Sequence, residues 1–160
     1  MLFRSPEKGT VCRVYLPIAR PEPEASREER APEGLHFGSG TILLVDDDGA
    51  IQKTAEEMLR ALGYGVILAR DGREGVEVLR ARADEIDAVI LDVVMPVMSG
   101  HEAFAQMRAL VPDLRVLVSS GFRDDPRIEE ILSAGARGFI QKPYTLRQLS
   151  VELHRIVQME

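Results

Sequence analysis

Apolar runs alternate with amphipathic segments along the chain from residue 41 onward. Five short runs rich in valine, isoleucine and leucine are expected to form strands, namely TILLV (41–45), GVILA (65–69), AVIL (88–91), RVLVS (115–119) and GFI (138–140). Each run is followed by a segment whose apolar residues recur with the spacing of a helix, so that they share one face. The first of these stripes is Ile51, Ala55, Met58, Leu59 and Leu62, and the last is Leu146, Leu149, Leu153, Ile156 and Val157. The pattern predicts five strands that alternate with five helices.

The apolar character of the expected strands also indicates the fold class. Strands without polar alternation are typical of a parallel sheet that helices cover on both faces. Right-handed crossovers and the short strand-helix repeat favour a flavodoxin-like, doubly wound α/β fold, (βα)5 with strand order 2-1-3-4-5. In such a sheet the ligand site lies at the carboxyl ends of the central strands.

A polar segment precedes this pattern. Residues 20–40, RPEPEASREERAPEGLHFGSG, combine proline, glutamate, arginine, glycine and serine with few side chains able to fill a core. This composition is typical of a linker. The chain is therefore expected to divide into an N-terminal segment (1–19), a polar linker (20–40) and one domain (41–158), whose length is common for a domain.

Net charge, cysteine content and the lack of long apolar runs limit the expected partners and location of the protein. A net charge of −6 over 160 residues argues against a general nucleic-acid-binding surface. The single cysteine, Cys12, cannot form an internal disulfide, and MLFRSPEKG at the N-terminus lacks the apolar region of a signal peptide. No apolar run reaches the roughly 20 residues that cross a bilayer. We therefore expect a cytoplasmic location without direct membrane contact, which does not exclude a membrane anchor in a longer parent chain.

Residues with catalytic potential follow the expected strands. They are Asp46, Asp47 and Asp48 after the first strand, Asp92 at the end of the third, Ser119, Ser120 and Gly121 at the fourth, and Lys142 and Pro143 at the fifth. The carboxyl ends of parallel strands meet at one edge of a sheet, so these groups are expected to share a crevice. Clustered carboxylates repel one another unless a cation lies among them, and Mg²⁺ suits such a site. An aspartate beside Mg²⁺, facing a lysine and a hydroxyl, has the groups needed to accept a phosphoryl group.

These residues carry a resemblance to a known family. Residues 41–158 resemble the receiver domain of two-component response regulators, with matching order and spacing in the segments LLVDD, ILDVVMPVMSG, SSG and AGARGFIQKP. The resemblance implies that Asp92 is the phosphoacceptor. It also implies that Mg²⁺ is bound by Asp47 directly, by Asp46 through water, by Asp92 and by the backbone carbonyl of Val94.

The resemblance implies further roles around the acceptor. Lys142 pairs with the phosphoryl group, Ser120 is the hydroxyl that moves toward it, and Phe139 is the aromatic switch that rotates into the vacated space. The Lys142-Pro143 bond is often cis in this family. The outcome is a remodelled surface on the fourth helix, fifth strand and fifth helix, through which a homodimer is also expected.

The expected partners follow from this chemistry. A phosphohistidine on a histidine kinase, or a small phosphodonor, supplies the phosphoryl group, and a histidine phosphotransfer domain is a candidate recipient. Self-phosphorylation and autodephosphorylation at Asp92 would be the only chemistry of this chain itself. Val94 and Phe122 are apolar where a polar side chain could position an attacking water, so a long-lived phosphoaspartate is expected. Gly100 is expected to supply a turn with positive φ.

Alternatives remain for individual residues. Ser119 competes with Ser120 for the hydroxyl role. LLVDDDGAI (43–51) also fits the opening motif of haloacid-dehalogenase-like phosphohydrolases, with Asp46 as nucleophile and Asp48 as acid and base. No second acidic pair follows Lys142, and the chain is short for that fold. A non-catalytic, receiver-like scaffold is a third alternative, although the acids, hydroxyl and lysine are all present.

The N-terminal segment carries a second, shorter resemblance. Residues 7–18, EKGTVCRVYLPI, alternate like a strand and resemble the closing strand of the histidine-kinase ATPase domain. A kinase tail, a linker and a receiver in this order imply the C-terminal part of a hybrid sensor histidine kinase, whose parent chain would be a phosphotransferase. The nucleotide-binding motifs are absent from this segment. A stand-alone response regulator, with residues 1–40 as a vector-derived or disordered leader, is the alternative.

Overall fold

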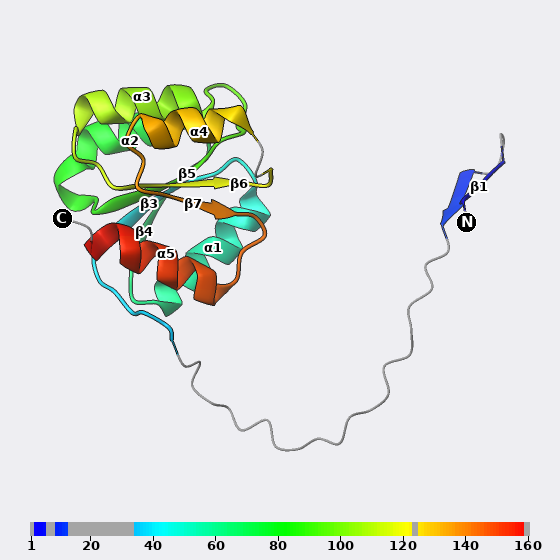
Figure 1. Ribbon diagram of the computed structural model, residues 1–160, viewed down its shortest axis with the longest axis horizontal. Coiled ribbons are helices and arrows are strands. Elements are labelled where there is room, and N and C mark those ends of the chain that lie inside the picture. Colours follow the sequence, from blue (N-terminus) through cyan, green and yellow to red (C-terminus); the bar gives the residue numbers. More distant parts are fainter. Residues whose placement is uncertain (1, 6–8, 13–33, 123–124, 159–160) are drawn as a thin grey trace, which may run out of the picture. The chain divides into compact units, whose positions relative to one another are not determined.

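The computed structural model describes residues 2–5, 9–12, 34–122 and 125–158 (Figure 1). The chain forms two compact units, Met1–Glu33 and Gly34–Glu160. Among the described residues, no helix is both long and apolar enough to span a bilayer.

The larger unit contains a five-stranded parallel sheet. Its strands are β3 (Thr41–Val45), β4 (Gly65–Ala69), β5 (Ala88–Asp92), β6 (Val116–Ser120) and β7 (Gly138–Gln141). They lie in the order β4-β3-β5-β6-β7, which confirms the predicted order 2-1-3-4-5. The three central strands are fully buried except for Thr41, as expected for largely apolar strands that helices cover on both faces.

Helices cover both faces of this sheet. They are α1 (Gly49–Ala61), α2 (Gly72–Arg82), α3 (Gly100–Leu110), α4 (Pro126–Ser133) and α5 (Leu146–Gln158), with a short 3-10 turn, η1 (Ala83–Glu85), after α2. Figure 1 shows α1 and α5 on one face and α2, α3 and α4 on the other. Two apolar clusters correspond to these faces, one built with Leu59 and Leu153 and the other with Val76 and Phe104.

The predicted helix stripes agree with the observed burial, with one addition. Ala55, Leu59 and Leu62 of the first stripe are almost fully buried, whereas Ile51 and Met58 are half-buried. Gln52 is also buried although it lies outside the apolar pattern, because its Nε2 donates a hydrogen bond of 2.7 Å to the carbonyl of Ala69. A buried amide that is satisfied in this way costs little free energy, and it joins α1 to the end of β4.

Local backbone chemistry determines the path of the loop that follows β5. The expectation that Gly100 has a positive φ is wrong. The positive φ belongs to Val97, at 68°, in the same loop. Gly100 is needed for another reason, because a Cβ at this position would lie 2.1 Å from the backbone oxygen of Asp92. The Ser99 hydroxyl and the Glu102 carboxylate then form a capping box that begins α3.

The larger unit begins earlier than predicted. The linker was expected to extend to residue 40, but residues 34–40 belong to this compact unit. Leu35 packs against the apolar cluster beneath α5, and the Gly38 amide donates a hydrogen bond of 2.9 Å to the carbonyl of Leu62. The polar composition of residues 34–40 gave no sign that a few of them pack against the domain. The rest of the predicted linker, residues 20–33, lies outside the described residues.

The N-terminal unit contains an antiparallel hairpin of β1 (Leu2–Ser5) and β2 (Gly9–Cys12). β2 lies within the strand that was expected over residues 7–18, whose other members fall outside the described residues. β1 was not predicted, because a run of four residues is too short for its alternation to be significant.

Candidate functional site

Three carboxylates gather at the carboxyl edge of the sheet. Asp46 and Asp47 follow β3, Asp92 ends β5, and these two strands are neighbours. One oxygen from each of the three side chains lies within 4.8 Å of the other two. Asp46 and Asp92 are only 1% and 6% exposed, whereas Asp47 is exposed. The site is therefore an acidic crevice with one side open to solvent.

Lys142 spans the two buried acids. Its Nζ lies 2.5 Å from Oδ2 of Asp46 and 2.9 Å from Oδ2 of Asp92. The lysine directly follows β7, where its amide donates a hydrogen bond of 2.9 Å to the carbonyl of Ser120. The Lys142-Pro143 peptide bond is cis, as the resemblance implied. The Lys142 ammonium, which follows β7, and the Asp92 carboxylate, which ends β5, thus meet across the end of the intervening strand β6.

The crevice perturbs the protonation of both members of this pair. Burial raises the pKa of the Asp92 carboxyl, an effect that the Lys142 ammonium and the Val94 amide reduce and that the Asp46 charge reinforces. Burial by itself lowers the pKa of Lys142, but its hydrogen bonds to Asp46 and Asp92 outweigh this effect and leave the pKa raised. Lys142 is therefore an ammonium at neutral pH.

The raised pKa predicts a pH-dependent effect of Asp92→Asn on stability. The folded state holds the Asp92 proton more tightly than the unfolded chain, so this carboxyl's contribution to stability decreases as pH rises through the folded-state pKa. Asparagine cannot ionise. In metal-free buffer at pH 7 the variant is therefore expected to unfold at a higher urea concentration than the wild type. The difference between their unfolding midpoints is expected to disappear as the pH falls toward 3.8, the ordinary pKa of an aspartate.

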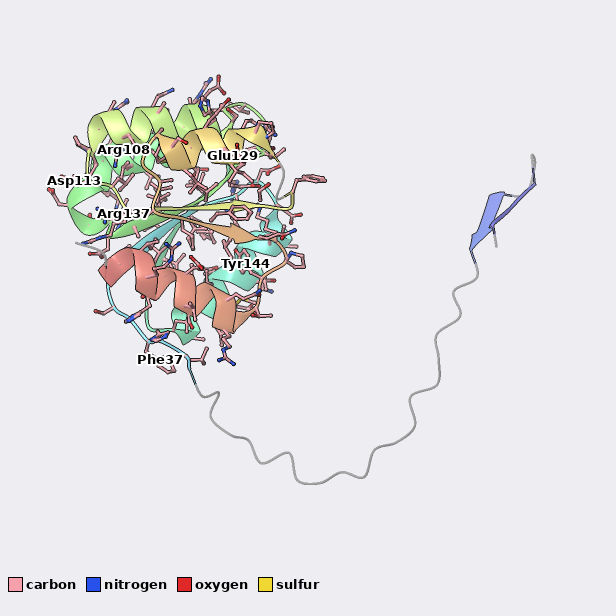
Figure 2. The ribbon with its side chains drawn as sticks, in the orientation of Figure 1. Phe37, Arg108, Asp113, Glu129, Arg137 and Tyr144 are labelled. Carbon is pink, nitrogen blue, oxygen red and sulfur yellow. The ribbon has the colours of Figure 1, made fainter. Side chains whose placement is uncertain are left out.

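Urea unfolding at several pH values measures this gap. Asp113→Asn is the matched control, because Asp113 is an exposed aspartate on the loop that precedes β6 (Figure 2). A gap that grows as the solution is acidified would contradict the raised pKa.

Both candidate hydroxyls lie at the end of β6. Ser119 and Ser120 are 1% and 0% exposed, and Ser119 is in register with Asp92. The Ser120 Oγ accepts a hydrogen bond of 3.2 Å from the Phe122 amide. Both residues thus lie at the edge of the sheet that carries the acids, and the assignment of the responsive hydroxyl to Ser120 stays a prediction.

Phe139 lies on the last strand, away from the acids. The ring is half-buried in β7 and packs against the cluster under α2, α3 and α4. Phe139 also lines a hollow of about 340 Å³ beside α5, together with Val151, which is 40% exposed. The ring thus lies on the surface formed by α4, β7 and α5, and its switch role stays a prediction.

Two apolar side chains lie in the loops that follow β5 and β6. Val94 is 46% exposed, and its amide donates a hydrogen bond of 3.3 Å to Oδ1 of Asp92. Phe122 is 74% exposed after β6. The loops that follow β5 and β6 thus carry exposed apolar side chains at the edge of the sheet where the acids lie.

Tyr144 is a neighbour of the site that sequence reasoning missed. It lies where the chain passes from β7 into α5 (Figure 2). Burial, together with the charges of Asp46 and Asp92, raises its pKa to about 12. Its buried hydroxyl has no hydrogen-bond partner among the described residues. Its position directly after Lys142-Pro143 was the only available signal.

Tyr144 lines a groove beside the crevice. The groove has a volume of about 490 Å³ and is lined largely by apolar groups of α1 and of the segment after β7, including Ile51, Met58 and Pro143. Lys142 also lines the groove, so an apolar surface continues directly from the charged site.

The chain is similar to proteins of two-component signalling. Residues 42–154 match the family model described as the response regulator receiver domain. The sensor kinase CckA of Brucella abortus is 30% identical over 160 residues, which cover 96% of this chain and 17% of that protein. The response regulator MprA of Mycolicibacterium vanbaalenii is 36% identical over 117 residues, which cover 73% of this chain and 50% of that protein. The chain thus spans half or less of these relatives.

A solved structure has the same fold. The receiver domain of the sensor histidine kinase PA1611 from Pseudomonas aeruginosa, described with a magnesium ion coordinated in its active-site cleft, is 29% identical. The match has a TM-score of 0.69 and covers 76% of this chain and 100% of that one. The fold and the sequence match agree, and the chain belongs to the family of response regulator receiver domains.

Proposed function

We propose that Asp92 accepts a phosphoryl group and holds it as an acyl phosphate. The observation that supports this role is the position of its carboxylate, which is buried, 2.9 Å from the Lys142 ammonium, and grouped with Asp46 and Asp47 within 4.8 Å. A carboxylate so placed is close to the positive charge that an incoming phosphoryl group needs.

In the proposed step an oxygen of Asp92 attacks phosphorus. The bond between phosphorus and the donor breaks, and the leaving imidazole of a phosphohistidine keeps the electron pair and takes up a proton. Lys142 pairs with the phosphoryl oxygens, and this requires its Nζ to leave one of its two present carboxylate partners. Asp92 must be ionised to attack, and above its raised pKa it is.

The residues of the crevice fit a hard divalent cation. The Asp46, Asp47 and Asp92 carboxylates, with the Val94 carbonyl, are oxygen donors of the kind that Mg²⁺ prefers. When bound, Mg²⁺ neutralises charge on the transferring oxygens. We therefore propose that phosphorylation of Asp92 depends on Mg²⁺.

The proposed output is a change of the α4-β7-α5 surface. Ser120 moves toward the phosphoryl group and donates a hydrogen bond to it. Phe139 then rotates into the space that Ser120 leaves. The hollow beside Phe139 and the exposed Val151 make this surface suitable for a protein partner or a second copy of the chain.

We propose that the chain is part of a hybrid sensor histidine kinase. The alignment with the sensor kinase CckA covers 96% of this chain and therefore includes most of the N-terminal segment. A two-stranded hairpin such as β1-β2 is marginally stable by itself, which fits the end of a larger sheet. The phosphoryl group would arrive from a kinase histidine and leave to a histidine phosphotransfer domain in the cytoplasm. A stand-alone response regulator is the alternative.

The rival phosphohydrolase function fits the geometry less well. Asp48, its required acid and base, accepts hydrogen bonds from the amides of Ala50 and Ile51 and caps α1. This side chain therefore has a structural role that the reaction would disrupt.

Mapping the phosphorylated residue tests the proposed function. The protein is incubated with a small phosphodonor and Mg²⁺, the acyl phosphate is reduced with borohydride, and the peptides are analysed by mass spectrometry. We expect the modification on Asp92 and its loss when a chelator is present. Modification of Asp46 would favour the phosphohydrolase instead.

The apolar rim of the crevice predicts a slow loss of the phosphoryl group. Val94 and Phe122 offer no hydrogen bond to an attacking water. Val94→Asn is expected to shorten the lifetime of the phosphoaspartate several-fold, measured as the decay of trapped acyl phosphate over time. Val97→Asn is the matched control, since Val97 is 70% exposed in the same loop and asparagine tolerates its positive φ. An unchanged decay in Val94→Asn refutes the role of the rim.

A further inference from the structure

Arg127 lies in the first turn of α4, at the edge of the sheet that carries the acids. β6 ends at Ser120, and α4 begins one short loop later, directly after its N-cap Asp125. Ser119 of β6 is in register with Asp92, so the acids and the beginning of α4 belong to the same edge (Figure 1). The guanidinium is therefore a further cation in the neighbourhood of the phosphoacceptor.

The Arg127 side chain is at present paired with Asp125. Its Nε lies 2.9 Å from Oδ1 and its Nη2 lies 2.6 Å from Oδ2 of that carboxylate. The same carboxylate caps α4, since Oδ1 also accepts a hydrogen bond of 3.0 Å from the Arg127 amide. The Asp125 side chain is 10% exposed, whereas that of Arg127 is 43% exposed. The guanidinium can therefore change its partner while the carboxylate remains at the helix that it caps.

The charge of Asp92 acts on this guanidinium. The hydrogen bond to Asp125 is the main reason that the pKa of Arg127 is raised; burial opposes this effect, and the charges of Asp125 and Asp92 add to it. The ion-pair partner of Asp92 itself is Lys142, at 2.9 Å. Arg127 is thus within the electrostatic reach of the acceptor without being paired with it.

A phosphoryl group on Asp92 changes the competition for Arg127. Such a group carries about −1.5 to −2 charge and three acceptor oxygens. These oxygens extend beyond the carboxylate to which the group is attached. A guanidinium binds phosphate through two parallel N–H donors, a geometry that an ammonium lacks. Asp125 offers a smaller charge and fewer oxygens, so the phosphorylated acceptor is the stronger partner.

We propose that Arg127 exchanges Asp125 for the phosphoryl group on Asp92 and thereby couples phosphorylation to α4. The step breaks and forms ionic hydrogen bonds only, and Asp125 keeps its role as the cap. Ile128 and Ile131 bury α4 in the core, so a displacement of its first turn is expected to shift the helix on the surface formed by α4, β7 and α5. This inference rests on the proposed function of Asp92.

Binding of beryllofluoride with Mg²⁺ tests the exchange. This tetrahedral fluoride complex occupies the place of a phosphoryl group on an aspartate without being transferred, and its fluorines accept hydrogen bonds. The full chain is titrated, and binding is followed by the amide NMR signals of β5. Arg127→Gln is expected to weaken the affinity several-fold, and Arg127→Lys is expected to restore part of it through its charge. An affinity of Arg127→Gln equal to that of the wild type overturns the proposal.

The Nε proton of Arg127 provides a direct signature in the wild type. Its NMR signal reports the hydrogen bond to Asp125 in the free protein. We expect this signal to shift when beryllofluoride binds, because the guanidinium acquires a new partner. A signal that stays in place while the β5 amides shift contradicts the exchange.

Asp125→Asn is expected to change the affinity in the opposite direction. Asparagine caps a helix about as well as aspartate, but it lacks the charge that holds Arg127. The affinity should rise several-fold, and this gain should disappear when Asp125→Asn is combined with Arg127→Gln. A loss of α4 structure would weaken binding in both single variants. A gain of the same size in the double variant would come from the Asp125 charge itself and would overturn the proposal.

Arg82→Gln is the matched control. Arg82 is 45% exposed and pairs with Glu85 at 2.7 Å, but it ends α2, at the edge of the sheet where β5 begins. Its affinity should equal that of the wild type, and a loss as large as in Arg127→Gln contradicts a specific role. Labelling of Asp92 is measured on the same samples. A wild type that neither binds beryllofluoride nor is labelled refutes the proposed function, whereas normal labelling with unchanged affinity in Arg127→Gln refutes this inference alone.

Discussion

Asp92→Asn is expected to reduce labelling of the chain by a small phosphodonor to background. The neutral amide oxygen is a far weaker nucleophile toward phosphorus than the charged carboxylate, and neither Asp46 nor Asp47 is equivalently placed. Asp46 contacts Lys142 at 2.5 Å and accepts a hydrogen bond of 3.0 Å from the Asp48 amide, and in the proposed function it binds the metal together with the exposed Asp47. The measurement is the yield of acid-stable, base-labile phosphoprotein in the presence of Mg²⁺.

The size of this effect distinguishes the acceptor from its neighbours. Asp113→Asn, which changes an exposed aspartate outside the crevice, should retain full labelling. Asp46→Asn should lower the yield of labelled protein, with the label still on Asp92, because Asp46 is proposed to help bind the metal. Full labelling of Asp92→Asn would require another nucleophile and would remove the basis of the proposed function.

Lys142→Ala is expected to destabilise the folded protein by about 3 kcal/mol in metal-free buffer. Removing one partner from a buried ion pair leaves the remaining charge without compensation, and such changes cost on the order of 3–5 kcal/mol. Here two carboxylates, Asp46 and Asp92, lose the same cation, and both are nearly inaccessible to solvent. Protonation of one carboxyl reduces the cost. Urea unfolding at pH 7 measures it.

Mg²⁺ provides the control for this prediction. If the acids lack a cation in Lys142→Ala, added Mg²⁺ should stabilise the variant more than the wild type. Lys53→Ala, an exposed lysine on α1, should show neither the loss nor the added stabilisation. A variant as stable as the wild type without Mg²⁺ would show that Lys142 is not needed to balance the buried charges.

Some features resisted prediction because they depend on approaches between distant segments. The role of Gly100 was predicted from the sequence as a turn, but the structure shows a close approach to the Asp92 backbone, and the positive φ falls on Val97. Gln52 lies outside the apolar stripe of α1, but it is buried and its Nε2 donates a hydrogen bond to the Ala69 carbonyl. In each case the deciding partner is separated in sequence from the residue, so no local pattern could indicate it.

The sequence by itself determined the parallel sheet, its strand order and the group of residues at its carboxyl edge. It could do so because apolar runs of strand length need burial on both faces, and parallel strands must then end at the same edge. Only the tertiary structure decided that Lys142 contacts Asp46 and Asp92 together, and that Leu35 packs against the cluster that includes the α5 side chains. It also decided that the Tyr144 hydroxyl is buried with no hydrogen-bond partner among the described residues. These contacts depend on the distance between side chains of different elements, which the packing of helices on the sheet determines and which residue order alone does not contain.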